Sequence, residues 1–244
     1  MRILLLVLAL LGAPMLIAAK PVPRAPAHRT APAAPRAVVN WVKTFAATPE
    51  GGVRMGNPNA PVKLIEYGSR LCPYCGRFHA ESMATLRGTY VASGKVSYEF
   101  RDYPVHGALD LAPILIGHCV STANYFPLLD LMMAAQPEFL SHEDEAIKAV
   151  QQQGLDKAPA ARLATFFAEK LGLIPFMAKR GMTPQRTRAC LAAKPGMDAL
   201  VKRYDDANSR YNVRGTPTFI INGKVAQDVN DWAGLEPLLK AAGA

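Results

Sequence analysis

Two cysteines separated by two residues are the feature of this sequence with the clearest chemistry. Cys72, Pro73, Tyr74 and Cys75 come after the apolar run 62–67, with four residues between. Two thiols at this spacing at the start of a helix can close into a disulfide without moving the backbone, so the segment can hold or release two electrons. The motif predicts thiol–disulfide exchange.

Cys72 is expected to be the reactive thiolate of the pair. If a helix begins at the motif, unpaired backbone N–H groups and the positive end of the helix dipole lie beside Cys72 and lower its pKa. Pro73 suits the first helical position, where a missing N–H costs nothing. Cys75 lies one turn further in and should resolve mixed disulfides from the inside. Because a stabilised Cys72 thiolate favours the reduced pair, the oxidised form should donate its disulfide.

The elements that must position this pair can be predicted from hydrophobic periodicity and from the placement of proline and glycine. A strand on each side of the motif helix gives a βαβ unit. In chain order we predict a turn-rich segment at 50–61, a strand at 62–67, the motif helix, a strand at 96–101, several short helices within 107–200, a helix at 198–212, a strand at 216–221, a hairpin through Asn222-Gly223, and a last helix starting near Asp231.

Composition places the chain among globular proteins of enzyme size. Of its 244 residues 50% are hydrophobic and 19% are charged, which is enough to bury one good core. The net charge of +9 comes from 28 Lys and Arg against 19 Asp and Glu. These basic residues are scattered, with no aromatic-basic platform or zinc-finger spacing, so we expect a solvated surface and no nucleic-acid binding.

The N-terminus is typical of an exported protein. Residues 1–19 combine a short positive start, an apolar run and the small residues Ala18-Ala19, which predicts a signal peptide. Residues 20–49 are a Pro- and Ala-rich tether and lead-in. We expect a periplasmic location, with the protein tethered to the membrane if the signal is left uncleaved.

The order of these elements resembles the DsbA family of bacterial envelope disulfide oxidoreductases. The resemblance covers about residues 50–242 and rests on the CxxC motif after a strand, on the late Gly215-Thr216-Pro217, and on the local patterns Met55-Gly56-Asn57-Pro58, Ala60-Pro61-Val62 and Glu66-Tyr67-Gly68-Ser69. It implies an α/β, thioredoxin-like fold with an inserted α-helical subdomain. The implied thioredoxin-like domain comprises 50–106 and 198–244, and the helical insertion comprises 107–197.

The resemblance also implies roles for three residues outside the motif. Pro217 would be a cis-proline facing the two cysteines, and Thr216 would offer its main chain to an extended substrate segment. Glu66 would be a buried acid that accepts and returns the proton of Cys75. The alternative for Glu66 is a partly exposed strand residue paired with Lys63 or another base.

By the same resemblance the protein would introduce disulfides into reduced or unfolded exported proteins and would need no cofactor. A DsbB-like, quinone-linked membrane protein would recharge it. Tyr74 replaces the histidine of the family's best-known oxidase, which leaves open a reductase or isomerase kept reduced by a DsbD-like partner. An isomerase of that kind needs an N-terminal dimerisation domain, for which the short signal and tether leave no room, so we expect a monomeric oxidase.

The remaining cysteines and one histidine complete the candidate residues. The resemblance implies a structural disulfide between Cys119 and Cys190, and two buried free thiols are the alternative. His79 follows Cys75 by one helical turn and suggests a minor alternative, a metal-binding or chaperone-like module. A fourth ligand is not evident, so we predict no metal site and treat His79 as a surface or packing residue. Arg70 is expected either to add positive potential near Cys72 or to lie in solvent.

Overall fold

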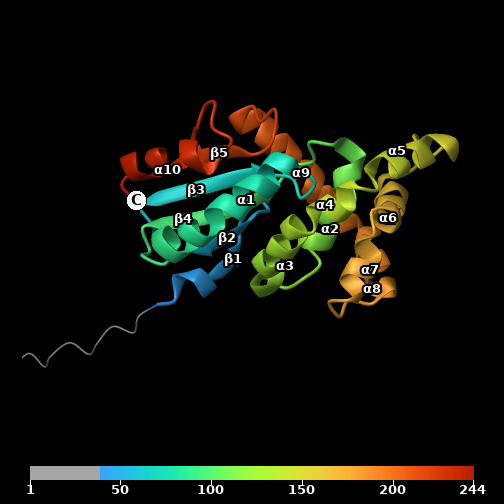
Figure 1. The fold of residues 1–244 in the computed structure, drawn as a ribbon, viewed down its shortest axis with the longest axis horizontal. Helices are drawn as coiled ribbons and strands as arrows, with labels where there is room; N and C mark the ends of the chain where they lie inside the picture. The colour runs from blue at the N-terminus through green and yellow to red at the C-terminus, as the bar shows by residue number, and fades with distance from the viewer. Residues whose placement is uncertain (1–38) are drawn as a thin grey trace, which may run out of the picture. The chain divides into compact units, whose positions relative to one another are not determined.

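The computed structural model describes residues 39–244, so the predicted signal peptide at 1–19 and most of the tether at 20–49 lie outside the described residues. Within them a 6-stranded sheet has the order β1-β2-β4-β3-β5-β6 (Figure 1). Strands β3 and β4 are parallel, and the other neighbouring pairs are antiparallel. The strands are β1 (Phe45–Ala47), β2 (Val53–Gly56), β3 (Val62–Gly68), β4 (Val96–Asp102), β5 (Thr218–Ile221) and β6 (Lys224–Val225).

Strand β3 directly precedes the motif helix in the chain, and one face of the strand lies beneath that helix. Side chains alternate along a strand, so Val62, Leu64 and Glu66 share one face and Ile65 and Tyr67 share the other. Val62 and Leu64 belong to the main hydrophobic core, together with residues of the motif helix. Glu66 therefore lies on the face of the sheet that this helix covers. The predicted βαβ unit is confirmed.

Helices cover both faces of the sheet. Helix α1 (Pro73–Thr85) and helix α10 (Trp232–Ala241) pack on one face through Phe78, Phe219 and Leu235. Helix α9 (Lys194–Tyr211) contacts the opposite face, where Ala207 packs with Tyr67. Helix α1 continues without a break into the π-helical turn Leu86–Val91, and a 3-10 turn, Trp41–Lys43, precedes β1.

A helical insertion separates β4 from α9, as expected. Figure 1 shows α5 to α8 gathered to one side of the sheet, and this segment has its own hydrophobic core. A disulfide joins Cys119, just after α2, to Cys190 in α8, with the two Cα atoms 6.2 Å apart. The insertion consists of a 3-10 turn (Gly107–Asp110), α2 (Leu111–Gly117), α3 (Thr122–Ala134), α4 (Gln136–Leu140), α5 (Glu143–Gln152), α6 (Ala160–Lys170), α7 (Leu173–Ala178) and α8 (Pro184–Leu191).

Two expected elements differ in the structure. The segment at 50–61 is not only turn but also contains β2, which pairs on both sides with β1 and β4. Strand β2 has only four residues and lies between Gly52 and Asn57-Pro58. Because glycine and Asn-Pro are typical of turns, the sequence pattern did not predict a strand here. Helix α9 begins at Lys194 rather than at 198, because Pro195 is accepted in the first helical turn. The domain boundaries at 107 and 197 stay a prediction.

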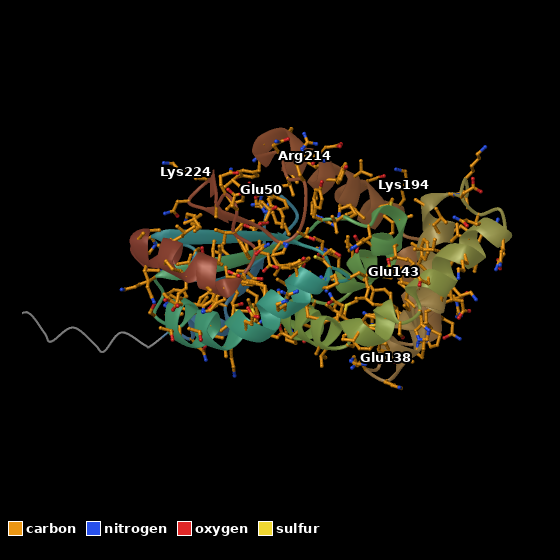
Figure 2. The ribbon with its side chains drawn as sticks, turned by 45° about the horizontal axis from the view of Figure 1, so that its top comes forward. Glu50, Glu138, Glu143, Lys194, Arg214 and Lys224 are labelled. Carbon is orange, nitrogen blue, oxygen red and sulfur yellow. A yellow bond between two sulfur atoms is a disulfide. The ribbon has the colours of Figure 1, made fainter. Side chains whose placement is uncertain are left out.

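The surface of the described chain mixes both signs of charge. In Figure 2 the labelled residues Lys224, Glu50 and Arg214 lie over the sheet, and Lys194, Glu138 and Glu143 lie over the helical part. Between residues 39 and 244, no helix combines the length and the apolar character needed to cross a membrane.

Candidate active site

Cys72 lies at the start of α1, as the motif predicts. It is the N-cap residue with an extended backbone, φ −76° and ψ 118°, and Pro73 occupies the first helical position. The Gly76 N–H donates to the Cys72 carbonyl at 3.1 Å, which closes the first turn. Cys72 is only 5% exposed, whereas Tyr74 of the same motif is 52% exposed. Cys72 is therefore less exposed to solvent than a residue at a freely accessible helix terminus would be.

The environment of Cys72 lowers its pKa from 9.0 to about 5. The largest cause is a hydrogen bond from the thiol of Cys75, and smaller contributions in the same direction come from the contact with Thr216 and from the backbone N–H groups of Cys75 and Tyr74. Burial, the second-largest effect, raises the pKa but is outweighed by the hydrogen bonds together. At neutral pH the Cys72 sulfur is therefore a thiolate.

Cys75 has the opposite character. It is fully buried, and burial is the main reason that its pKa lies well above the ordinary value. The hydrogen bond to Cys72 and the negative charge of Glu66 raise the pKa further. The pair thus consists of one thiolate and one thiol, both unbridged in this structure. A thiolate attacks and leaves readily in disulfide exchange, and a buried thiol must first lose its proton.

The loop before β5 faces the motif. The Thr216-Pro217 peptide bond is cis, and the Cys72 thiol can donate to the Thr216 carbonyl at 3.2 Å. Beside this loop lies an open hollow of about 640 Å³. Its lining is the chain on either side of β5 and β6, from Tyr211 to Thr218 and from Val225 to Asn230.

Glu66 is fully buried, as the resemblance implies. Its Oε2 accepts a hydrogen bond from the Tyr98 hydroxyl at 2.6 Å, and its Oε1 has no partner among residues 39–244. The alternative pairing with Lys63 is wrong, because Lys63 Nζ donates to the Pro58 carbonyl at 3.2 Å. One oxygen of the Glu66 carboxylate is therefore buried without a hydrogen-bond partner in the described part of the chain.

His79 is not a surface residue, contrary to one of our expectations. It is buried on α1 with Nε2 3.4 Å from Glu66 Oε2 and 3.4 Å from the Tyr98 hydroxyl. Its Nδ1 has no partner in the described chain, and its side chain lines a cavity of about 200 Å³ between α1 and α3. No cluster of metal-ligating side chains occurs within 39–244. The one-turn spacing from Cys75, combined with the face of β3 that holds Glu66, could have revealed this contact.

Arg70 does not project toward Cys72 or into solvent. It is fully buried, and Nε donates to Asp102 Oδ1 at 2.7 Å while Nη2 donates to Oδ2 at 3.2 Å. The guanidinium also lies over the ring of Tyr125, 5.0 Å from its centre. Arg70 holds the loop before the motif to the end of β4, a role that local sequence does not show.

A histidine that sequence reasoning did not single out lies on the Cys72 side of the motif. The Asp110 carboxylate accepts from the His106 backbone N–H at 2.7 Å and contacts its Nδ1 at 3.2 Å. The hydrogen bond to Asp110 is the main reason that the pKa of His106 is raised, and the charge of the Cys72 thiolate adds to it. The interaction is mutual, so a protonated His106 favours the Cys72 thiolate, a contribution that Tyr74 within the motif cannot make.

Comparison with known proteins agrees with this geometry. The sequence pattern of the family described as Thioredoxin matches residues 48–241. A crystal structure of protein-disulfide isomerase from Novosphingobium aromaticivorans is 30% identical, with a TM-score of 0.72 over 78% of this chain and 97% of that one. The fold is also that of alpha-DsbA1 from Wolbachia pipientis, with 19% identity and a TM-score of 0.60 over 78% of this chain and 89% of that chain.

A curated relative, a putative protein-disulfide oxidoreductase of Rickettsia bellii, is 23% identical over 75% of this chain, and the match spans 62% of the relative's length. The chain therefore belongs to the thioredoxin family, and its fold is DsbA-like.

Proposed function

We propose that this protein is an exported thiol:disulfide oxidoreductase that passes a Cys72–Cys75 disulfide to reduced proteins. The observation that carries the proposal is the contrast within the motif, where the pKa of Cys72 falls to about 5 while that of buried Cys75 is raised. Stabilising one thiolate stabilises the reduced pair against the disulfide and makes the oxidised form a donor. Export rests on the predicted signal peptide, which lies outside the described residues.

The exchange follows from this contrast. A substrate thiolate attacks the Cys72 sulfur, the Cys72–Cys75 bond breaks, and Cys75 leaves as a thiolate that takes up a proton. A second substrate thiolate then attacks the substrate sulfur of the mixed disulfide, and Cys72 leaves as a stable thiolate. The substrate gains one disulfide, and the protein gains two electrons. Thr216 and Pro217, beside the open hollow, would hold the extended substrate segment against the sulfur.

Glu66 and His79 supply the proton that Cys75 needs. Glu66 is the buried acid whose charge acts on Cys75, and His79 lies between Glu66 and a cavity that could hold water. We assign Glu66 as the proton donor and acceptor and His79 as its relay. Replacing His79 by Phe should slow proton exchange at Cys75 and leave the alkylation of Cys72 unchanged. Equal effects on both cysteines would contradict the relay.

A reduction potential tests the direction of the reaction. The protein is equilibrated with glutathione buffers, and the fraction oxidised is read by alkylation, with Cys72→Ser as the control. A value near about −120 mV indicates a strong oxidant, and one near about −270 mV indicates a thioredoxin-like reductant. Oxidative refolding of a reduced substrate should proceed with wild type and fail with Cys72→Ser. Refolding by Cys72→Ser would refute the proposal.

A reductase or isomerase is the second candidate. Tyr74 cannot become cationic, and the Arg77 guanidinium lies over its ring, 4.9 Å from the centre. The solved structure that is 30% identical is described as a protein-disulfide isomerase. A potential near the reductant value, with rapid reshuffling of a scrambled substrate, would favour this candidate. The recharging membrane protein would then be a DsbD-like reductase rather than a DsbB-like, quinone-linked oxidase.

A further inference from the structure

Arg203 on α9 is a buried cation without an ion-pair partner in the described chain. The residue is only 6% exposed, and none of the ion pairs within residues 39–244 includes it. Its one hydrogen bond there is a long one, from Nη1 to the Gly51 carbonyl at 3.4 Å, and its buried Nε has no partner. Burying a charge is costly unless a counter-charge or hydrogen bonds compensate for it.

The carboxylate that could compensate Arg203 is already occupied. Asp102 accepts four hydrogen bonds, two from Arg70, one from His118 at 2.9 Å and one from the Tyr125 hydroxyl at 2.6 Å. Burial lowers the pKa of His118, so this imidazole is neutral at pH 7. Two guanidinium groups therefore share one carboxylate, and one positive charge is left over.

Two nearby acids, Glu99 on β4 and Glu50 in the β1–β2 turn, do not neutralise Arg203. Glu99 Oε1 accepts from Arg101 Nε at 2.6 Å, and Glu50 Oε2 lies 3.6 Å from Arg101 Nη2. Glu50 also faces Arg210 at 4.0 Å. Glu99 is thus paired with Arg101, and Glu50 with Arg101 and Arg210, so neither acid is an ion-pair partner of Arg203. Burial is the main reason that the pKa of Arg203 is lowered; the negative charge of Asp102 opposes this shift without cancelling it, and the positive charge of Arg70 adds to it.

A cavity of about 240 Å³ lies against Arg203, where the β1–β2 turn, the α2–α3 loop and α9 meet. Gly51 makes room for the guanidinium, since a Cβ there would lie 2.9 Å from the Arg203 side chain. The N-terminal end of α3 also faces this cavity through Thr122, and no side chain caps that helix. Uncapped N–H groups and the helix dipole favour an anion at such an end.

We propose that this cavity binds a small oxyanion, with the Arg203 guanidinium as its main ligand and the start of α3 as its second. A guanidinium presents paired N–H groups that match two oxygens of a phosphate, sulfate or carboxylate. The bound anion supplies the missing negative charge and joins the sheet, the insertion and α9 at one point. The site is separate from the redox cysteines, and it does not depend on the proposed function.

Stability as a function of anion concentration tests the site. Thermal unfolding of the full chain is followed in increasing sodium phosphate, sulfate or acetate, with sodium chloride holding the ionic strength constant. A ligand that binds only the folded state raises the melting temperature, with a concentration dependence set by its Kd. We expect at least one oxyanion to produce this rise with a measurable Kd, and the three salts separate a tetrahedral anion from a carboxylate.

Variants show whether Arg203 is responsible. Arg203→Met should abolish the oxyanion dependence, and Arg210→Met, on the exposed side of the same helix, should retain it. Thr122→Pro, which removes one backbone N–H at the first helical position, where proline is tolerated, should weaken the apparent affinity several-fold. An equal rise in wild type and Arg203→Met would reflect exclusion of salt from the protein surface and would overturn the proposal. Titration calorimetry of wild type with phosphate, sulfate and acetate does not depend on the variants folding. One anion per chain supports the site, and no binding of any of them overturns it.

Discussion

Stability of the reduced and oxidised forms should depend differently on pH, because only the reduced form carries the Cys72 thiolate. The folded protein holds the pKa of Cys72 at about 5, against an ordinary value of 9.0. A thiol whose pKa is lowered by folding stabilises the fold fully above its unfolded pKa, and this stabilisation is lost as the pH falls to the folded pKa. Each pH unit in this window changes the contribution by about 1.4 kcal/mol. Because half of the folded thiols are already protonated at pH 5, lowering the pH from 7 to 5 should cost the reduced form about 2 kcal/mol relative to the oxidised form.

The assay is urea unfolding of both forms between pH 4 and pH 8, with a non-thiol reductant added to one of them. Groups whose pKa is the same in both forms cancel in the difference, and Cys75 does not interfere because its raised pKa lies above this range. Cys72→Ser should lose the pH-dependent excess of the reduced form. A difference that stays flat from pH 5 to pH 7, or that grows only above pH 8, would refute the assignment of the low pKa to Cys72.

Three substitutions test other parts of the structure. Arg70→Met leaves the buried Asp102 carboxylate without its ion-pair partner and should lower the free energy of unfolding by about 3–5 kcal/mol; an unchanged urea midpoint would contradict this. Cys119→Ala opens the disulfide of the insertion and should cost about 2–4 kcal/mol, while disulfide exchange by the motif should continue. Glu66→Gln removes a charge that raises the pKa of Cys75, so pH-dependent alkylation should show a lower pKa for Cys75, and an unchanged value would count against the role of Glu66.

The fold could be predicted where local pattern decides structure. The alternation along 62–67 defines β3, the Cys-Pro step defines the start of α1, and Asp231 caps α10 by accepting from the Gly234 N–H at 2.8 Å. Strand β2 was missed because its four residues become a strand only by pairing with β1 and β4. Pairing of that kind depends on tertiary context rather than on propensity.

The site was predictable to the extent that its residues are neighbours in sequence or belong to a family motif. Cys72 and Cys75 follow from spacing alone, whereas Glu66 needed the resemblance. The contacts of Arg70 with Asp102 and of His79 with Glu66 join residues from different elements. Long charged side chains are seldom fully buried, so sequence alone placed Arg70 either beside Cys72 or in solvent and did not predict its burial. Only the folded chain shows that its partner lies at the end of β4.

The most direct test of the central claim is the pH dependence of alkylation at each cysteine of the reduced protein, followed by peptide mass spectrometry. The rate for Cys72 should rise through a midpoint near pH 5, while Cys75 should stay unmodified until well above pH 9. Denatured protein provides the reference in which both thiols behave alike. A midpoint for Cys72 near pH 9, or earlier modification of Cys75, would contradict the assignment of Cys72 as the nucleophile.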